Sequence, residues 1–288
     1  MAAQVARAHG AHQEVSEREF FKMSGSGNDF VVFDARAEPA GRLATPPVIR
    51  EVCARGTGVG ADGMVFIEPS SVADAQFRMR YFNSDGSVAE MCGNASLCVT
   101  SLAATLGAGS ASGMRFETDS GIASSRISGG MPEVDLWPVT DVRPAAGIGA
   151  EPGEKRIGYA VVGNPHVVIL RDELETLEIV RRGRAIRLHE YVRAGGGANA
   201  NFVARRADGG FDIRTYERGV EDETLACGTG SVSTAILLAE WVEAGLETTL
   251  RTRSGREITI KLRREGGAWL PTLRGEGRIV FKGQLPVD

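Results

Sequence analysis

The sequence predicts an α+β protein with two pseudo-symmetric domains, each a mainly antiparallel β-sheet or barrel wrapped around a central α-helix. Three observations carry this prediction. Glycine supplies 37 of the 288 residues, twice the usual ~7%, which indicates many tight turns between short elements. Four motifs recur in the same order in the two halves of the chain. In each half a strand-like alternation of apolar residues comes before a helical spacing that starts at a Cys-Gly pair.

The repeat is defined by ordered matches between segments that are far apart in the chain. Residues 27–33 match 163–169, 60–62 match 197–199, 77–83 match 211–217, and 92–96 match 227–231. The offsets are 136, 137, 134 and 135 residues. Composition alone does not produce the same order twice, so we interpret the two halves as homologous units.

Domain boundaries follow from this repeat and from local composition. Residues 1–18 lack the apolar core of a secretory signal and are expected to form a mobile tail. The N-terminal half is expected at 19–137, completed by a return strand at 279–288, and the C-terminal half at 138–278. A segment rich in Pro and Gly at 137–154 is expected to link the halves.

The strands and helices of the two halves are expected at equivalent places. Residues 77–82 and 211–216 alternate between apolar and polar residues as strands do. Helical spacing covers 95–106 and 230–244, after each Cys-Gly pair. The second helix is apolar on almost every side over 231–239, which predicts that it is buried inside its domain.

Composition and charge exclude several classes of function. A net charge of −4 and a pI near 5.7 provide no basic face for nucleic acid or an anionic membrane surface. No apolar run reaches the roughly 18 residues of a membrane span. Four cysteines are too few for a disulfide scaffold, so we expect a reducing cytoplasm. There is no Cys-x-x-Cys pair, so we expect no metal site, and the expected partner is a small molecule.

Cys92 and Cys227 are expected at the N-terminal ends of the two equivalent helices. Such an end has unpaired N–H groups and a partial positive charge, which bind anions and lower the pKa of a thiol. If the pseudo-twofold axis brings the ends together, one thiolate removes an α-proton from a bound amino acid while the other thiol protonates the opposite face. This chemistry needs no cofactor. The ligand carboxylate is then expected to bind the N–H groups of Gly93, Asn94, Gly228 and Thr229.

The other two cysteines are interpreted differently. Cys98 falls inside the first predicted helix, and Cys53 has no matching cysteine in the second half. Burial as a small apolar residue is the commonest state of a free cysteine, and we expect it for both.

Polar residues in the Gly-rich loops predict recognition of an amino acid. Four asparagines recur at equivalent places in the two halves, where an amide both donates and accepts: Asn28, Asn83, Asn164 and Asn199. Glu217 and Arg218 come just before the second cysteine loop and are suited to bind an ammonium and a carboxylate respectively. In an alternative interpretation, His166 and Glu217 tune the nearby thiols by holding protons.

The sequence resembles the diaminopimelate epimerase family over about residues 20 to 285. The motifs that carry the resemblance are FFKMSGSGNDFVVFD (20–34), RGTGVGADG (55–63), YFNSDGSVAEMCGN (81–94), GNPH (163–166), NANF (199–202), YERGVEDETLACGTGS (216–231) and RGEGRIVFKG (274–283). Together these motifs are highly specific. The resemblance implies a homodimeric enzyme without PLP or another cofactor, which converts LL-diaminopimelate to meso-diaminopimelate in lysine and peptidoglycan synthesis.

The resemblance also implies roles for individual residues. Cys92 and Cys227 would be the two acid/base residues. The reacting carboxylate would be held by Gly93, Asn94, Gly228 and Thr229. The distal end of the substrate, which does not react, would be gripped by Asn28, Asn83, Asn164, Asn199, Glu217 and Arg218.

The chain departs from the family pattern in a few places. Ala95-Ser96-Leu97 replaces the usual Gly-Ala-Arg, from which we expect altered helix packing more than lost chemistry. Gly63 stands where some members have Gln, and Phe281 where the family often has a Tyr at the dimer contact. Proline racemases look similar around both cysteines but have His in place of Asn94, and phenazine-type isomerases lack the cysteine pair. A same-fold racemase of another amino acid and a non-catalytic amino-acid-binding relative are the alternatives.

Overall fold

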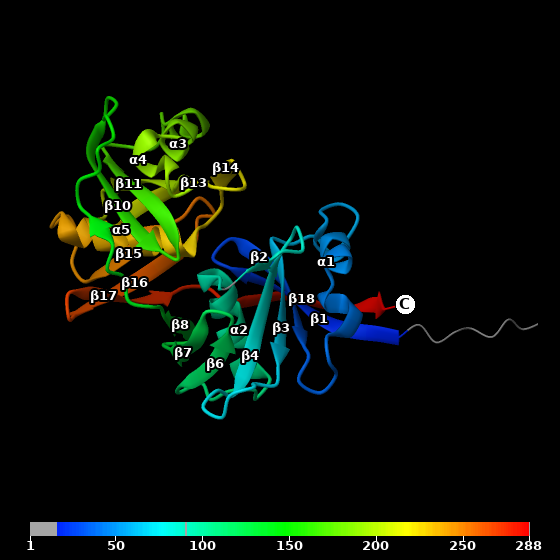
Figure 1. The fold of residues 1–288 in the computed structure, drawn as a ribbon. Helices are drawn as coiled ribbons and strands as arrows, with labels where there is room; N and C mark the ends of the chain where they lie inside the picture. The colour runs from blue at the N-terminus through cyan, green and yellow to red at the C-terminus, as the bar shows by residue number, and fades with distance from the viewer. Residues whose placement is uncertain (1–15, 90, 288) are drawn as a thin grey trace, which may run out of the picture.

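The computed structural model describes residues 16–89 and 91–287 and has two lobes, one from each half of the chain (Figure 1). Most of the predicted N-terminal tail, residues 1–15, lies outside the described residues. Strand β1 already begins at Ser16, so the last three residues of the predicted tail belong to a strand. Arg18 explains this extension, because its guanidinium donates to the carbonyls of Glu38 and Pro39 and pairs with the Glu38 carboxylate.

The first half contains the predicted strand and helix of the repeat. Its strands are β1 (Ser16–Gly25), β2 (Asn28–Asp34), β3 (Gly63–Glu68), β4 (Phe77–Asn83), β5 (Val88–Ala89), β6 (Met114–Thr118), β7 (Gly121–Ser128) and β8 (Met131–Asp135). Its helices are the 3-10 helix η1 (Gly41–Ala44), α1 (Pro46–Cys53) and α2 (Gly93–Thr105). The strand expected at 77–82 and the helix expected at 95–106 are therefore confirmed as β4 and α2.

The second half repeats this order of elements. Its strands are β9 (Val142–Arg143), β10 (Glu154–Val162), β11 (Asn164–Arg171), β12 (Asn199–Arg205), β13 (Phe211–Glu217), β14 (Asp222–Thr224), β15 (Glu247–Arg251), β16 (Glu257–Glu265) and β17 (Ala268–Arg274). The last strand, β18 (Arg278–Val287), pairs with β1 and so belongs to the first half. Its helices are α3 (Ile179–Arg187), α4 (Glu190–Arg193) and α5 (Gly228–Glu240). None of the helices in the described ranges is long and apolar enough to cross a bilayer.

The hydrogen-bonded strand order is the same in both halves. It runs β18-β1-β2-β3-β4-β6-β7-β8 in the first half and β9-β10-β11-β12-β13-β15-β16-β17 in the second. The parallel pairs are also equivalent: β2–β3 and β4–β6 in one half, β11–β12 and β13–β15 in the other. The other pairs of named strands are antiparallel, which confirms two repeated, mainly antiparallel domains.

Strands β8 and β17 join the two halves. They pair antiparallel, with Leu273 opposite Val134, and these two residues occupy equivalent positions in the repeat. The pseudo-twofold axis therefore passes between them. The same seam contains the buried carboxylate of Glu133, which accepts a hydrogen bond of 2.6 Å from Lys261 of the second half. Glu133 also pairs with Arg126 of its own half at 3.0 Å, so its buried carboxylate contacts cations from both halves at the seam.

The strand register corrects one of the repeat alignments. Phe30 pairs with Gly63 between β2 and β3, and His166 pairs with Asn199 between β11 and β12. Gly63, rather than Asp62, is therefore equivalent to Asn199, at the same offset of 136 residues that relates Phe30 to His166. The expectation that four asparagines recur at equivalent places is therefore wrong for two of them: Asn28 corresponds to Asn164, but Asn199 corresponds to Gly63 and Asn83 to Glu217. The Gly-Ala dipeptides before these strands lie in turns, where a one-residue slip of the sequence alignment changes no apolar pattern.

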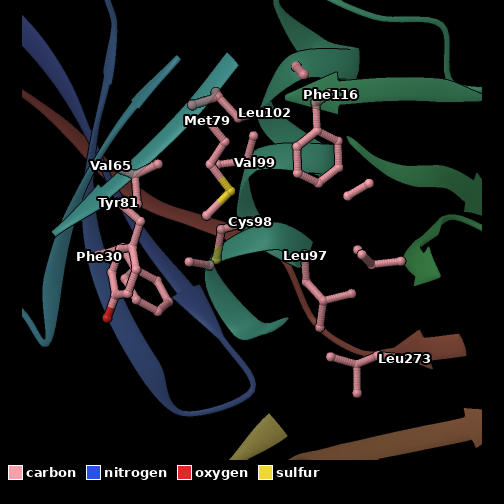
Figure 2. Packing of buried hydrophobic residues seen from close by; sticks show 14 of the residues in the cluster. Phe30, Val65, Met79, Tyr81, Leu97, Cys98, Val99, Leu102, Phe116 and Leu273 are labelled. Atoms are coloured by element: carbon pink, nitrogen blue, oxygen red, sulfur yellow. The ribbon is translucent and has the colours of Figure 1, made fainter. Parts of the chain in front are cut away.

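Each central helix fills the core of its own half. In the first half Leu97, Val99 and Leu102 of α2 are fully buried, and they pack among Met79 and Phe116 (Figure 2). Helix α5 is apolar on nearly every side, as predicted, and its residues Val232, Ala235 and Ile236 join the same cluster as α2. One continuous core thus crosses the seam. Burial of a Val, Leu, Ile or Phe side chain contributes about 1.5–3 kcal/mol, so this core fixes the position of both helix starts.

Helix α5 ends earlier than the pattern predicts, at Glu240 rather than at residue 244. The Glu243 N–H donates to the Leu238 carbonyl and the Val242 N–H donates to the Ala239 carbonyl, which is the Schellman arrangement. This geometry requires a left-handed residue after the C-cap, and Val242 has φ of +60° there. At the equivalent position after α2 stands Gly107, with φ of +65°.

Replacing Val242 by Gly should therefore stabilise the protein by about 1 kcal/mol. A β-branched residue in the left-handed region carries about 1–3 kcal/mol of strain, more than the ~0.5–1 kcal/mol of unfolded-state entropy that Gly adds. The side chain is 89% exposed, so little packing is lost. Urea unfolding of both proteins measures the difference. The matched change in the first half, Gly107→Val, should destabilise, and a loss of stability in Val242→Gly would contradict the assignment of strain.

Candidate active site

Both predicted catalytic cysteines are the N-cap residues of the central helices. Cys92 precedes α2 with φ −129° and ψ 122°, and Cys227 precedes α5 with φ −136° and ψ 109°. The prediction that each Cys-Gly pair opens a helix is confirmed. In both cases the first residue of the helix is the glycine, so the first N–H groups carry no side chain beside them.

The N-terminal ends of α2 and α5 both lie against one methyl group, Cδ2 of Leu273. A Cβ on Gly93 would lie 2.8 Å from Cδ2 of Leu273, and a Cβ on Gly228 would lie 3.5 Å from the same atom and 3.1 Å from Oδ1 of Asn94. The charge of Cys92 also contributes to the pKa of Cys227, so the two thiols interact electrostatically. The pseudo-twofold axis thus brings both Cys-Gly pairs to one point, where a side chain on either glycine would crowd Leu273 or Asn94.

The Cys227 thiol has defined hydrogen-bond partners. Its Sγ accepts from the Gly230 N–H at 3.4 Å and lies 3.6 Å from the hydroxyl of Thr229. That hydroxyl is 3.1 Å from Nε2 of His166. The Thr229 hydroxyl therefore connects His166 to the Cys227 thiol, as the hypothesis that His166 is a neighbour of a thiol requires.

Burial dominates the protonation of both thiols. It raises the pKa of Cys92 to about 11, although N–H groups of Ala95 and Asn94 lower it, and the carboxylates of Glu217 and Asp62 raise it further. Burial, followed by the charge of Glu217, raises the pKa of Cys227 to about 12. The expectation of a lowered thiol pKa is wrong, because the helix N–H groups do not outweigh desolvation.

Glu217 and His166 are the buried titratable neighbours of the site. Burial raises the pKa of the Glu217 carboxyl, and the charge of Asp62 adds to this effect. Burial and the cation of Arg218 lower the pKa of His166 to about 3, so the imidazole is neutral at physiological pH. Glu217 influences both thiols, whereas His166 is a neutral hydrogen-bonding group on the Cys227 side.

Three predicted residues gather at the rim of the second half. The Arg218 guanidinium donates to Oδ1 of Asn164 at 2.6 Å, and the Arg218 backbone N–H donates to Oδ1 of Asn199 at 2.7 Å. Both asparagines therefore hold Arg218 in place. A guanidinium fixed in this way suits a carboxylate ligand.

In the first half, Asn28 and Asn94 form a directed chain. Nδ2 of Asn28 donates to the Asp62 carboxylate at 3.0 Å, which leaves Oδ1 of Asn28 to accept from Nδ2 of Asn94. Oδ1 of Asn94 then faces the start of α5 and has no hydrogen-bond partner among the described residues, although Asn94 is 1% exposed. A buried acceptor without a donor costs about 1–3 kcal/mol, so this atom marks a place for a ligand donor.

Asn83, the fourth predicted asparagine, lies beside a tyrosine that the sequence did not single out. Oδ1 of Asn83 accepts from the Tyr81 hydroxyl at 3.1 Å, and Nδ2 donates to Oγ of Ser87. Burial and the charge of Cys92 raise the pKa of Tyr81 well above its usual range. Tyr81, Asp62 and Leu273 were missed because their roles depend on tertiary neighbours.

A cleft of about 420 Å³ opens between the halves beside Asn28. It is lined by Gly27, Asn28, Asp29, Arg55 and Asp62 from the first half and by Glu223, Thr224 and Leu225 from the second. Arg55 donates to Asp29 at 2.6 Å and to Asp62 at 2.8 Å, so the first-half wall is an ordered charge network. Within residues 16–89 and 91–287, no three His, Cys, Asp or Glu side chains are arranged to hold a metal ion.

The residues that depart from the family pattern after Asn94 face the core. Ala95, Ser96 and Leu97 are fully buried, and Oγ of Ser96 lies 3.6 Å from Sδ of Met79. Cys53 and Cys98 are buried too, and burial raises the pKa of Cys53 to about 11. Their packing agrees with the interpretation of both cysteines as small apolar residues.

Comparison with known proteins identifies the family. A sequence profile of diaminopimelate epimerase matches residues 20–135 and 158–278. The chain belongs to the diaminopimelate epimerase family. It is 46% identical over 275 residues to the diaminopimelate epimerase of Gemmatimonas aurantiaca, covering 92% of this chain and 98% of the relative. It is 39% identical over 277 residues to that of Aquifex aeolicus, covering 93% and 97% of the two chains.

Solved structures of lower similarity share the fold. A phenazine biosynthesis protein of Bacillus anthracis superposes with a TM-score of 0.73 at 15% identity, over 94% of this chain and 100% of that chain. A hydroxyproline epimerase of Agrobacterium vitis, solved with trans-4-hydroxy-L-proline, gives a TM-score of 0.68 at 17% identity, over 96% and 94% of the two chains. The predicted α+β architecture of two repeated domains is confirmed.

The lowered pKa of His166 predicts a pH dependence of stability. The unfolded chain binds a proton on this imidazole at about pH 6.5, whereas the folded protein does so only at about pH 3. The free energy of unfolding should therefore fall as the pH is lowered through this window. Denaturant unfolding at about pH 7 and about pH 4 should show a smaller loss in His166→Gln than in the wild type. Equal losses would contradict a neutral, buried His166.

Proposed function

We propose that this protein epimerises LL-diaminopimelate to meso-diaminopimelate by a two-base mechanism, in lysine and peptidoglycan biosynthesis. The observation that carries the proposal is the meeting of two Cys-capped helix starts at Leu273 in a member of the diaminopimelate epimerase family. The substrate is an amino acid, and the reaction requires neither PLP nor a metal. The enzyme is cytoplasmic.

The reacting carboxylate binds between the two helix ends. Its oxygens accept from the N–H groups of Gly93, Asn94, Gly228 and Thr229. As the α-proton leaves, negative charge develops on this carboxylate, and both helix dipoles stabilise it in a site that excludes water. The unpartnered Oδ1 of Asn94 faces the same space and accepts from the α-ammonium.

Protons move between the substrate and the two thiols. The thiolate of one cysteine takes the α-proton and becomes a thiol, while the thiol of the other gives a proton to the opposite face and becomes a thiolate. The configuration at the α-carbon inverts, and the enzyme is left with its protons exchanged between Cys92 and Cys227. Glu217 and His166 tune these thiols, Glu217 as a buried carboxyl that influences both and His166 as a neutral hydrogen-bonding group.

Ionisation of a thiol has to overcome burial. Both thiols have a raised pKa and are protonated at neutral pH. The α-ammonium of a bound amino acid brings a positive charge close to the sulfur atoms and favours a thiolate. Substrate binding thus creates the base that the reaction needs.

The distal end of the substrate is recognised by the polar rim of the cleft. Glu217 binds the distal ammonium, and Arg218, held by Asn164 and Asn199, binds the distal carboxylate. Asn28 and Asn83 complete this set from the first half. A substrate with a second ammonium and a second carboxylate at its distal end binds these groups, whereas proline has no distal ammonium or carboxylate to bind them.

The proposed domains and assembly follow the repeat. The N-terminal half spans 19–137 with the return strand 279–288, which the pairing of β18 with β1 supports, and the C-terminal half spans 138–278. The enzyme is a homodimer. Among the described strands β18 has no second partner, and its residues Val280 and Phe281 are 46% and 47% exposed, which suits a contact with a second copy.

The direct test is α-proton exchange in deuterated water with LL-diaminopimelate and a reductant. The wild type should exchange the α-proton and form the meso isomer, because both faces of the α-carbon have a proton carrier. Cys92→Ala and Cys227→Ala should each lose epimerisation by about 10³-fold or more, because removal of one carrier breaks the proton path. Mass spectrometry measures deuterium, and chiral chromatography measures inversion.

Two variants serve as controls for the loss of a cysteine. Cys53→Ala and Cys98→Ala remove buried thiols outside the site and should keep epimerisation near the wild-type rate at a temperature where both remain folded. No exchange in the wild type with this substrate would contradict the proposed reaction. Exchange with another amino acid would then indicate a racemase of that substrate, and binding without any exchange would indicate a non-catalytic relative.

A further inference from the structure

A chain of hydrogen bonds runs from the interior of the second half to Cys227. Asn201, on β12, is fully buried, and its Nδ2 lies 3.2 Å from the Val167 carbonyl and 3.2 Å from Nδ1 of His166. Its Oδ1 accepts from the Thr215 hydroxyl at 3.0 Å. The chain continues from Nε2 of His166 to the Thr229 hydroxyl at 3.1 Å and from there to Sγ of Cys227 at 3.6 Å.

The direction of every hydrogen bond in this chain follows from the first one, between Asn201 and the Val167 carbonyl. A backbone carbonyl only accepts, so the Asn201 atom that faces Val167 is the amide nitrogen. The same nitrogen donates to Nδ1 of His166, which therefore has no proton. A neutral imidazole then carries its proton on Nε2 and donates it to the oxygen of Thr229. The hydroxyl proton of Thr229 remains free to point at Cys227.

The backbone supports the same proximity. A Cβ on Gly230 would lie 2.3 Å from Oδ1 of Asn201 and 3.2 Å from Sγ of Cys227. A side chain at the third residue of α5 would therefore displace the Asn201 amide, because Asn201 and the thiol approach Gly230 together. Asn201 is thus in the immediate surroundings of the site, although no bond connects it to the sulfur directly.

The first half contains no equivalent chain. The strand registers relate His166 to Phe30, Asn201 to Val65 and Thr215 to Tyr81. Apolar residues thus occupy the places of the imidazole and the amide. Repetition of the fold has duplicated the Cys-Gly helix start, whereas the polar support exists on the Cys227 side alone among the described residues.

We propose that Asn201 is a positioning residue that holds His166 in the Nε2–H tautomer, so that the Thr229 hydroxyl donates to the thiolate of Cys227. The catalytic use of this thiolate rests on the proposed function, but the tautomer and the hydrogen bond do not. The chain stabilises negative charge on Cys227 with neutral groups. The titratable and charged groups that face it are Glu217 and Cys92 at the sulfur and Arg218 at the imidazole.

The tautomer can be measured in the wild-type protein without substrate. Nitrogen-15 spectra of the histidine rings distinguish Nε2–H from Nδ1–H, and the His166 signals are those absent from His166→Gln. The expected result is the Nε2–H form of His166 at neutral pH. An Nδ1–H form or an imidazolium would overturn the proposal. In Asn201→Leu the Nε2–H form should no longer dominate, because the donor to Nδ1 is gone.

The effect on the thiol is measured from thiolate absorbance as a function of pH. For the wild type and for each variant, the titration curve of Cys227 is obtained by subtracting the absorbance of the same protein with the additional change Cys227→Ala. Asn201→Leu should reduce the thiolate fraction of Cys227 about tenfold at a given pH, since a hydrogen bond to a charged group is lost. Thr229→Val should have a similar effect, and the double variant should add little, because both act through one hydroxyl.

Cys92 is the matched internal control. Its titration, obtained with Cys92→Ala, should not change in Asn201→Leu, whereas a general structural disturbance would shift both thiols. An unchanged Cys227 titration, or equal shifts of both thiols, would overturn the proposal. If Asn201→Leu does not fold, Thr215→Val removes the bond to Oδ1 alone and should shift Cys227 in the same direction. If these results are obtained but the epimerase assay fails, the proposed function is rejected. The hydrogen-bond chain from Asn201 to Cys227 is then still supported.

Discussion

The structure depends on one constraint, which is that two helices from different halves begin at the same point. Gly93 and Gly228 both lie against Leu273, and a Cβ at Gly93 would require the Leu273 side chain to shift. The pairing of β8 with β17 and the core shared by α2 and α5 hold the helices there. Fixed N–H groups at one place can stabilise developing charge without reorganisation, which is the main electrostatic requirement of α-proton removal.

The site balances two opposing effects on the thiols. Helix N–H groups favour a thiolate, but burial and Glu217 raise the pKa of Cys92 to about 11 and of Cys227 to about 12. Removal of a weakly acidic α-proton needs a strongly basic thiolate, and burial makes the thiolate more basic. The same burial keeps the fraction of each cysteine that is ionised small. Hydrogen bonds to the Cys227 sulfur, such as those of Thr229 and of the Gly230 N–H, make the two thiols chemically different although both cysteines are N-cap residues.

Much of this arrangement could be predicted from the sequence, because its main signal is local. The ordered repeat gave the two halves, and the change of periodicity after each Cys-Gly pair gave both helix starts. Leu273, Asn201 and Tyr81 could not be found in this way, since each acts through contacts between strands distant in sequence. The end of α5 was missed because Val242, and not glycine, occupies the left-handed position. The thiol pKa was misjudged because burial is a tertiary property.

The central claim is that Cys92 and Cys227 face the same point, and oxidative cross-linking tests it most directly. Mild oxidation of the folded protein, followed by proteolysis and mass spectrometry without reduction, shows which cysteines are joined. The account predicts one intramolecular disulfide, between Cys92 and Cys227, with loss of activity that a reductant reverses. Oxidation that leaves these two thiols unlinked, or that joins either of them to Cys53 or Cys98 in the folded protein, would contradict it.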